Sequence, residues 1–471
     1  MNGRHRAPIL AAICILVAAL LPSCTVSRYP ATAPRGLPGK PFSEDADWQL
    51  QDISGMSDAE FVDMVERDTA RFFIEAVHPE SGLITDNGRI SHVGSNGFGL
   101  IGICIAAERG WITREDAATR VLKILNTFLN TAANRDGMLW WITDAATATK
   151  NVYNGSYDVV ETAYVIDGAL VCKQYFDGDA EDERKIREYA DALYARAEFD
   201  KFVKPERETG KLGLVWGYDP KKDALGSLLL VGYHEAQVVV ITALGSPTHP
   251  APDEVYEVWT NGYTWTEVQG EEYFFCPALF THQYSPALLD LRKIQDAPTR
   301  EKGITYFENS TRATRSHINY AKKNPGGYPG YGPIWGLTDC GCPLHEHHFG
   351  GHGMSPPWDI EDQRDDGTVA VSASGASIMF TPEESIACLR HIYGKFGERV
   401  YDRHGFKSAF NEKIDWFSKG HDALNKGAML CAIENYRSGM VWGLFMRNPE
   451  IVRGLEKAGF TPIADPGTME P

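Results

Sequence analysis

"YDVVETAYVIDGALVCKQYF", residues 157–176, predicts a helix that is apolar on nearly every side, and such a helix is usually buried all round. Asp158 and Glu161 share one face of this helix, one turn apart, while Asp167 points the opposite way. Two buried carboxylates repel each other and lose hydration, so they are costly unless they serve acid–base chemistry or bind sugar hydroxyls. The alternatives are a helix N-terminus, where acids are favoured, or an ion pair with a distant arginine.

The rest of the chain repeats the helical signal in two alternating forms. Periodicity predicts helices at residues 58–77, 112–130, 157–176, 182–199, 226–245, 311–324, 381–397, 398–418 and 426–446. Those near residues 160, 235 and 435 are almost entirely apolar, and those near 65, 120, 190 and 405 are amphipathic. A buried inner ring and a half-exposed outer ring would produce this alternation. The sequence therefore predicts an all-α toroid of helical hairpins, with long aromatic- and glycine-rich loops over a central cleft.

Local signals predict a few element boundaries. Thr113 is expected to cap the helix that follows it. Thr381, Pro382 and Glu384 form another helix start, with a cap, a proline at the first position and an acid at the third. Strand signals are few, and they predict hairpins at residues 88–94 and 263–275.

The N-terminal segment is predicted to target and tether the protein. A basic start and a short apolar run end in "LPSC", which resembles a bacterial lipobox, so residues 1–23 are expected to be a lipoprotein signal peptide. Cys24 would then carry the lipid anchor; a plain signal peptide and an N-terminal membrane helix are the alternatives. Residues 24–45, rich in Pro, Gly and Ser, are predicted to be a flexible tether, and residues 46–465 a single catalytic domain. No acidic retention residue follows Cys24, which favours anchoring to the outer membrane, in the periplasm or at the cell surface.

Composition excludes several classes of function. The net charge of −17 argues against nucleic-acid binding and disfavours strongly anionic substrates, whereas a neutral oligo- or polysaccharide fits it. The chain has no P-loop, no dinucleotide fingerprint and no G-x-S-x-G elbow, so no nucleotide cofactor and no serine nucleophile are expected. We expect no cofactor at all.

Glu235, in "VGYHEAQVVV", is a second acidic anomaly. Its predicted helical neighbours are apolar, which should raise its pKa. A carboxylic acid that stays protonated near neutral pH can protonate a leaving sugar oxygen. A buried Glu paired with Arg or hydrogen-bonded to a loop is the alternative.

The loop "CGCPLHEHH", residues 340–348, contains residue types that bind zinc, namely Cys340, Cys342, His345 and His347. Their spacing matches none of the common zinc motifs, so no metal is expected. The alternative interpretation is a pocket loop whose histidines bind substrate or backbone.

Aromatic residues are numerous, with 11 Trp and 20 Tyr, and their faces can stack on sugar rings. Most aromatic side chains in any protein belong to the core. Those in loops, above all Trp216 and Trp335, are the better candidates for sugar binding.

Several strings together resemble the bacterial glucoamylase-like family that includes endo-β-1,2-glucanases, glycoside hydrolase family 144. They are "GSNGFGLIGICIAAERGWITREDA", "YDVVETAYVIDGALVCKQYF", "GYHEAQVVVITALGSPTHP", "ALFTHQY", "YGPIWGLTD", "DDGTVAVSASGAS", "FTPEESIACLRHIYGKFGERVYDRHGF" and "ENYRSGMVWGLFM". The resemblance covers residues 57–460 and implies an (α/α)6 toroid that hydrolyses β-1,2-glucan with inversion. It implies that Asp158, Glu161 and Glu235 are catalytic, with Glu235 as the general acid. The substrate-binding candidates are Phe98, Trp216, Tyr233, His282, Trp335 and Asp339.

The catalytic base is left open by the sequence. Relatives of this family have an Asp in a string like A-I-D-Q-G-P, whereas residues 423–427 here read "ALNKG". Asp158 and Glu161 are too close on one helix turn to form the working pair by themselves, so Glu235 opposite Asp158 or Glu161 is the minimum hypothesis. Asp339, Asp366 and Asp422 are alternative bases. Two other functions remain open: a transglycosylase, lyase or epimerase on the same toroid, and a non-catalytic glycan-binding lipoprotein.

Overall fold

The computed structural model describes residues 41–44, 48–85, 88–153, 155–341, 353–354 and 365–463. The predicted signal peptide, Cys24 and most of the tether lie outside these residues. So do Cys342, His345 and His347 of the cysteine- and histidine-rich loop.

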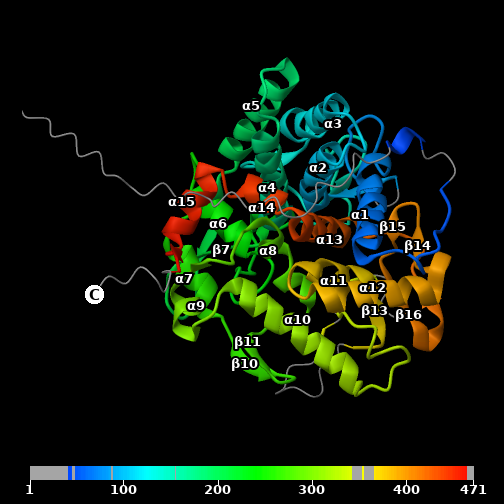
Figure 1. Ribbon diagram of the computed structural model, residues 1–471. Helices are drawn as coiled ribbons and strands as arrows, with labels where there is room; N and C mark the ends of the chain where they lie inside the picture. The colour runs from blue at the N-terminus through cyan, green and yellow to red at the C-terminus, as the bar shows by residue number, and fades with distance from the viewer. Residues whose placement is uncertain are drawn as a thin grey trace, which may run out of the picture.

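Two sets of helices alternate along the described chain and build an (α/α)6 toroid (Figure 1). The inner helices are α2 (Val93–Glu108), α4 (Val159–Tyr175), α6 (Gln237–Gly245), α8 (Tyr284–Leu288), α11 (Val371–Ala376) and α13 (Ala423–Arg437). The outer helices are α1 (Asp58–Glu75), α3 (Arg114–Asn126), α5 (Glu181–Arg196), α7 (Glu254–Asn261), α10 (Tyr306–Lys323) and α12 (Pro382–Phe396). Helix α2 contacts α4 and α13, α4 contacts α6, α6 contacts α8, and α13 contacts α8 and α11. The predicted ring of hairpins is confirmed.

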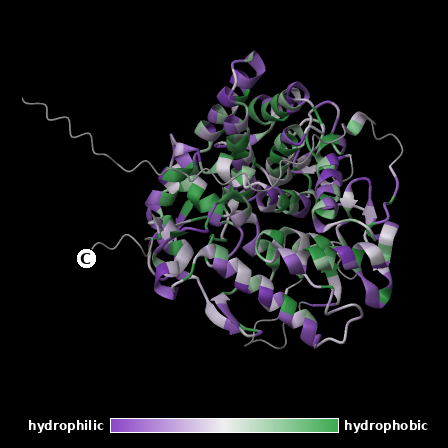
Figure 2. Cartoon of the chain, viewed as in Figure 1, coloured by the Kyte–Doolittle hydropathy of each residue, from purple (hydrophilic) through white to green (hydrophobic). Residues whose placement is uncertain are grey.

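Hydrophobicity explains which helices lie inside. Nearly every residue of α2, α4 and α6 is buried, whereas α5 and α10 bury only one face. Figure 2 shows this contrast, with the apolar colour running through the inner helices and the polar colour dominating α5 and α10. Burial of apolar surface on both sides of each inner helix is the main stabilising term of such a ring.

Three shorter helices complete the helical part: α9 (Ala297–Lys302), α14 (Met440–Phe445) and α15 (Pro449–Lys457). Helix α14 packs against α4, α8 and α13, and α15 packs on α6. Short 3-10 or π turns lie at Phe42–Glu44, Thr127–Thr131, Phe199–Lys201, Leu279–His282, Ser377–Met379, Gly397–Arg399 and Glu412–Ile414.

Small antiparallel sheets connect the helices. The largest has the order β2-β3-β5-β8-β9, from Asn134–Arg135, Met138–Trp140, Tyr157–Asp158, Gly217–Asp219 and Ala224–Leu225. A second joins β13 (Thr368–Ala370), β16 (Ala409–Asn411) and β17 (Trp416–Phe417). The two-stranded pairs are β1 (Ile90–His92) with β4 (Ile142–Asp144), β6 (Val203–Pro205) with β7 (Leu212–Leu214), β10 (Trp265–Val268) with β11 (Glu271–Phe274), β12 (Ile294–Gln295) with β18 (Thr461–Pro462), and β14 (Tyr401–Asp402) with β15 (Gly405–Phe406).

Three predicted helices are wrong in part or in full. The helix predicted at residues 426–446 is divided at Gly439, which adopts a left-handed φ of 72°, into α13 and α14. Residues 226–236 are not helical, because Leu228 and Leu230 hydrogen-bond to the strand region 214–216 and Gly232 adopts a left-handed φ of 92°. Residues 398–418 form β14 to β17, with the turns at Gly405 and Asp415 in the left-handed region (φ 78° and 54°). Helical periodicity in the sequence does not outweigh pairing with a distant strand.

The predicted element ends fare better. Thr113 caps α3 by accepting a hydrogen bond from the Asp116 N–H. Thr381 precedes α12 and Pro382 opens it, but the Thr381 side chain makes no cap hydrogen bond. The hairpin predicted within residues 263–275 is confirmed as β10–β11, whereas the strand within residues 88–94 pairs with β4 instead of folding on itself.

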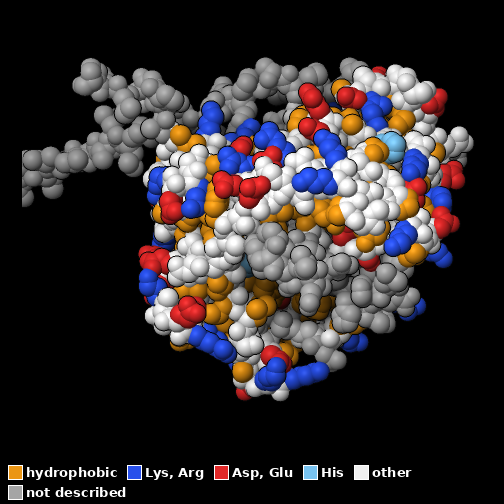
Figure 3. All heavy atoms as spheres, turned by 90° about the horizontal axis from the view of Figure 1, so that it is seen from below, with side chains coloured by type: hydrophobic (Ala, Val, Ile, Leu, Met, Phe, Trp, Pro, Cys, Tyr) orange, Lys and Arg blue, Asp and Glu red, His pale blue; other side chains and the backbone are white. Residues whose placement is uncertain are grey.

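Within the described residues no helix is both long and apolar enough to cross a membrane. On the face drawn in Figure 3, acidic and basic side chains are interspersed rather than gathered into patches of one sign.

Candidate active site

The acidic side chains meet where inner helices begin. Asp158 is the N-cap of α4, Asp422 is the N-cap of α13, and Glu235 lies two residues before α6. His92 is the N-cap of α2. Unpaired backbone N–H groups and the helix dipole stabilise negative charge at a helix N-terminus. The N-termini of these inner helices are therefore suited to hold the carboxylates of the candidate site.

Asp158 belongs to strand β5 and ends it. Its carboxylate accepts a hydrogen bond from the Glu161 N–H at 2.9 Å and another from the Trp216 indole. The side chain is therefore a helix cap, the alternative raised from the sequence, rather than a mid-helix acid on the same face as Glu161. Burial raises the pKa of Asp158 to about 7, and the nearby charge of Glu235 raises it too.

Glu161 lies in the first turn of α4, pressed against the start of α2. Its carboxylate accepts a hydrogen bond from the Gly94 N–H, and a Cβ at position 94 would approach that oxygen to 2.8 Å. Only glycine therefore permits this close contact. Burial, followed by the charge of Asp158, raises the pKa of Glu161 to about 8; Glu235 and Asp422 also contribute. Glu161 is thus expected to be protonated near neutral pH.

Glu235 is held by its backbone and presents its side chain to the site. Its carbonyl accepts hydrogen bonds from Ser285 Oγ at 2.7 Å and from the Tyr164 hydroxyl at 3.1 Å. The carboxylate lies 3.4 Å from His234 Nδ1, and 12% of the side chain is exposed. The His234 ring also stacks on the Trp216 ring. Trp216 is the residue whose indole donates to Asp158, so His234 and Trp216 together connect Glu235 to Asp158.

A cavity of about 300 Å³ is lined by two further acids, Asp339 and Asp422, and not by Asp158, Glu161 or Glu235 themselves; the charges of Glu235 and Asp422 act on groups of both sets. The cavity is lined by His92, Ser95, Phe280, Tyr284, Asp339, Gly341, Ser408, Ser418, Gly420, His421, Asp422, Leu424 and Asn425. Burial, then the charges of Asp422 and Glu235, raise the pKa of Asp339 to about 7. The size is at the lower limit for small-molecule pockets, and the lining combines aromatic and acidic groups.

Comparison with known proteins places the fold in a family. Residues 228–449 match the Glycoamylase family model, which describes glucoamylase-like proteins. The crystal structure of a glucoamylase-like protein from Bacteroides uniformis is 30% identical, with a TM-score of 0.78 over 88% of this chain and 99% of that one. The chain belongs to the glucoamylase-like family.

Two relatives have names that specify a substrate. An endo-β-1,2-glucanase from Chitinophaga pinensis, in complex with sophorotriose and glucose, is 28% identical, with a TM-score of 0.78 over 86% of this chain and 99% of that one. An exo β-1,2-glucooligosaccharide sophorohydrolase from Parabacteroides distasonis is 30% identical over 445 residues, or 85% of this chain. The chain spans 58% of the length of that curated relative.

Several predicted sugar-binding residues of this glucoamylase-like protein lie in the core. Phe98 packs against Tyr164 and Tyr284 and is 1% exposed. The rings of Tyr233 and His282 lie 4.9 Å apart and tilted, and Trp335 is also buried. None of these four side chains lines the cavity, whereas Asp339 lines it and Trp216 donates a hydrogen bond to Asp158.

Two further candidates from the sequence, Asp366 and Cys340, lie away from the cavity lining. The Asp366 carboxylate accepts a hydrogen bond from the Thr368 N–H at the start of β13. Cys340 is buried, and among the described residues it belongs to no group of three or more His, Cys, Asp and Glu side chains that could hold a metal ion. The interpretation of the 340–348 loop as a zinc site stays a prediction.

Sequence reasoning did not identify His92, Tyr284 and Asn425 as part of the site. Tyr284 donates to Asn425 Oδ1 at 2.8 Å, and Asn425 in turn donates to Asp422 Oδ2 at 2.8 Å. The spacing D-x-x-N at residues 422–425 is a cap signal that could have indicated the start of α13.

Replacing Glu161 with glutamine is expected to stabilise the protein increasingly as pH rises. Glu161 titrates near its usual value of about 4.5 in the unfolded chain and near 8 in the folded one, so wild type loses stability between these values as pH rises. The amide of the Glu161→Gln variant does not titrate and escapes this loss, which amounts to at most about 5 kcal/mol above pH 8. Urea unfolding at pH 5 and pH 8.5 measures the difference.

The matched control for that experiment is Glu308→Gln, which removes a half-exposed first-turn acid of α10. Its stability relative to wild type should change little across the same pH interval. A Glu161→Gln difference that is equally large at both pH values would contradict the raised pKa.

Proposed function

We propose that this protein is a glycoside hydrolase that cleaves β-1,2-linked glucan. The observation that carries the proposal is the convergence of Glu235, Asp158 and Glu161 with Asp339 and Asp422, joined by mutual electrostatic interactions beside one cavity. Paired carboxyl groups beside a sugar-sized cavity are the machinery of glycoside hydrolysis. The relatives that share fold and sequence, a β-1,2-glucanase and a sophorohydrolase, supply the linkage.

Glu235 is the proposed proton donor. Among the three acids named by the sequence it has the most exposed side chain, and its carboxylate is not used in a helix cap. Its proton would pass to the glycosidic oxygen as the bond from C1 to that oxygen breaks. Asp158 and Glu161 are committed to backbone donors, so they would hold the site in place and limit its negative charge.

Asp422 is the proposed general base. It lines the cavity, and its two oxygens accept hydrogen bonds from Asn425 N at 3.1 Å and Asn425 Nδ2 at 2.8 Å. These donors, at the N-terminus of α13, stabilise a carboxylate. Asp422 would take a proton from water as that water bonds to C1 on the face opposite the leaving group. The product then has the inverted configuration, which requires carboxyl groups about 6.5–9.5 Å apart.

Linear β-1,2-glucan is the substrate for the direct test. Incubation with the protein is expected to release reducing ends, and NMR of the first products should show α-configured new ends. If neither this glucan nor any related glucan yields new reducing ends, the proposal is contradicted. A constant number of reducing ends with redistributed chain lengths would indicate a transglycosylase. An unsaturated or epimerised sugar product would indicate a lyase or an epimerase. Binding without turnover would indicate a glycan-binding protein.

The proposed cellular location rests on the N-terminal sequence. Anchoring through lipid on Cys24, at the periplasmic side of the outer membrane or at the cell surface, would bring the site to external glucan. Release of the Cys24→Ala variant from the membrane fraction, with wild type retained, is the expected result; equal retention would contradict the anchor.

A further inference from the structure

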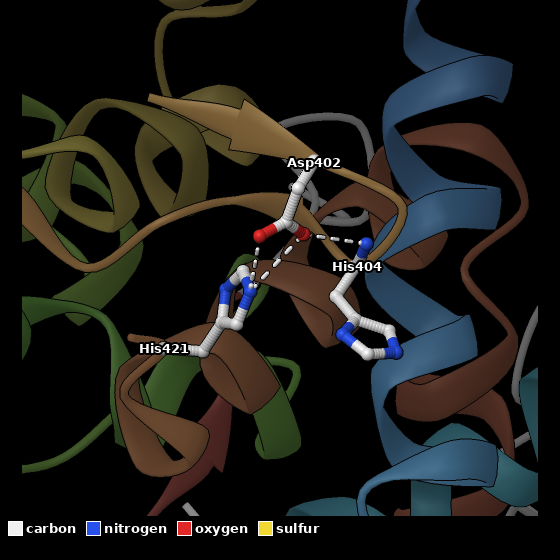
Figure 4. A group of neighbouring side chains, drawn as sticks. All are labelled: Asp402, His404 and His421. Carbon is white, nitrogen blue, oxygen red and sulfur yellow. Dashed lines mark hydrogen bonds and ion pairs between the residues drawn. The ribbon is translucent and has the colours of Figure 1, made fainter. Parts of the chain in front are cut away.

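We propose that Asp402, His404 and His421 form a binding site for a divalent transition metal ion, with zinc as the best match. Asp402 ends strand β14, His404 lies in the turn to β15, and His421 directly precedes the N-cap of α13. One ligand atom from each lies within 4.8 Å of the others. Figure 4 shows the carboxylate of Asp402 between the His421 ring and the turn that carries His404.

The hydrogen bonds of His421 point to a cation between its ring and Asp402. Nδ1 lies 3.1 Å from the Phe406 carbonyl, which can only accept, so Nδ1 carries the proton. In the neutral ring Nε2 then carries a lone pair and no proton, and it lies 3.2 Å from each oxygen of Asp402. Two acceptors at this distance attract each other only through a proton or a metal ion.

His404 is oriented in the same manner. Its Nε2 lies 2.9 Å from a Glu75 carboxylate oxygen, which leaves Nδ1 as the ligand atom. Glu75 is held in turn by Arg403 at 2.7 Å. A metal-binding histidine usually donates its other N–H to a carboxylate or a backbone carbonyl, and Glu75 and the Phe406 carbonyl are such partners.

The ligand types, and the one separation that matches tetrahedral spacing, favour zinc. The three ligand atoms lie within 4.8 Å of one another, so the wider gaps would have to close when the ion binds. Zinc bonds of about 2.0–2.2 Å in a tetrahedron place neighbouring ligand atoms roughly 3.3 Å apart, and His421 Nε2 and Asp402 are separated by 3.2 Å. Two imidazoles and one carboxylate suit zinc and its neighbours rather than calcium or magnesium, which prefer oxygen ligands. The fourth position would hold water.

Lys426 is the charge that opposes a metal ion here. Its ammonium donates to the carbonyls of His404 and Phe406, at 2.7 and 2.8 Å, and it also interacts electrostatically with Asp402. The carboxylates of Asp402 and Glu75, which contact the two histidine rings, supply the compensating negative charge. The site also has a structural consequence, because His421 lines the cavity and is followed at once by Asp422. A metal ion bound here would link the segment that carries His421 and Asp422 to the β14–β15 turn. The contact of His404 with Glu75 extends this link to the end of α1.

The experiment uses the purified protein after removal of metal with a chelator. Titration with zinc chloride is expected to show one tight equivalent by calorimetry and metal analysis, with a rise in Tm. Cobalt in place of zinc should give the visible absorption of a tetrahedral site. Asp402→Asn keeps the shape and the oxygen that accepts the His404 N–H but removes the charged ligand, so zinc affinity should fall at least about 10–100-fold.

The matched control is His249→Ala, which removes the histidine of the other His and carboxylate group in the described residues, with Glu198 and Asp200. Its zinc stoichiometry should equal that of wild type. Loss of the tight equivalent in His249→Ala with retention in Asp402→Asn would assign the metal to the wrong cluster and overturn the proposal. Absence of zinc binding in wild type would also overturn the proposal, and would mean that a proton rather than a metal ion joins His421 to Asp402. Circular dichroism checks that each variant is folded.

Discussion

Glu235→Gln is expected to lower kcat on linear β-1,2-glucan by about 10³-fold, within the range of roughly 10²–10⁴ for loss of a general acid. Glutamine has almost the same shape as glutamate but cannot give a proton to the departing sugar oxygen. The backbone carbonyl of residue 235 keeps its bonds to Ser285 and Tyr164, so the loop before α6 should not move. Initial rates of reducing-end release measure kcat, and KM should change little.

A reactive leaving group makes this test specific. A β-glucoside with a dinitrophenolate leaving group needs little protonation, so its hydrolysis should suffer far less in Glu235→Gln than that of the glucan. A structural defect would lower both rates equally. Glu308→Gln is the control and should keep wild-type rates. Full activity of Glu235→Gln on the glucan would overturn the assignment of the acid.

Asp422→Asn is expected to lower kcat by a similar factor, about 10³-fold, because the amide cannot accept the proton of the attacking water. The fold should tolerate this change well. Asparagine is as good an N-cap as aspartate, and its oxygen can still accept from the Asn425 N–H. Its amide nitrogen cannot accept from Asn425 Nδ2 as the second oxygen of Asp422 does, so loss of one hydrogen bond should lower stability by about 1 kcal/mol. Thermal unfolding should show this modest loss, whereas the rate on β-1,2-glucan should fall by far more.

Asp339→Asn distinguishes the two cavity-lining acids. If Asp422 is the base, Asp339→Asn should retain clearly more activity than Asp422→Asn. The reverse order would transfer the role to Asp339. Asp296→Asn supplies a matched control, because Asp296 also caps a helix, α9, but bonds to Tyr256 and Tyr306 and does not line the cavity.

Apolar periodicity predicted the type of architecture but not every helix of the ring, because α2, α7, α8 and α11 lie outside the ranges that it indicated. A helix such as 159–175 has no polar face, so it can only be buried, and its amphipathic partners can only lie outside. The same reasoning failed at residues 226–236, which pair with the strand region near Val215, and at residues 398–418. The latter form two local hairpins, β14–β15 and β16–β17, and β16 also pairs with the distant β13. Helical periodicity did not reveal either kind of pairing.

The three acids of the candidate site were also visible in the sequence, because a carboxylate in an apolar stretch stands out. Only the tertiary structure decided that Asp158 caps its helix, that Asp339 and Asp422 border the cavity, and that Phe98 and Tyr233 belong to the core. The physical reason is that a sequence determines which side chains prefer burial. The closure of the ring determines which helix ends meet, and with them which charges interact.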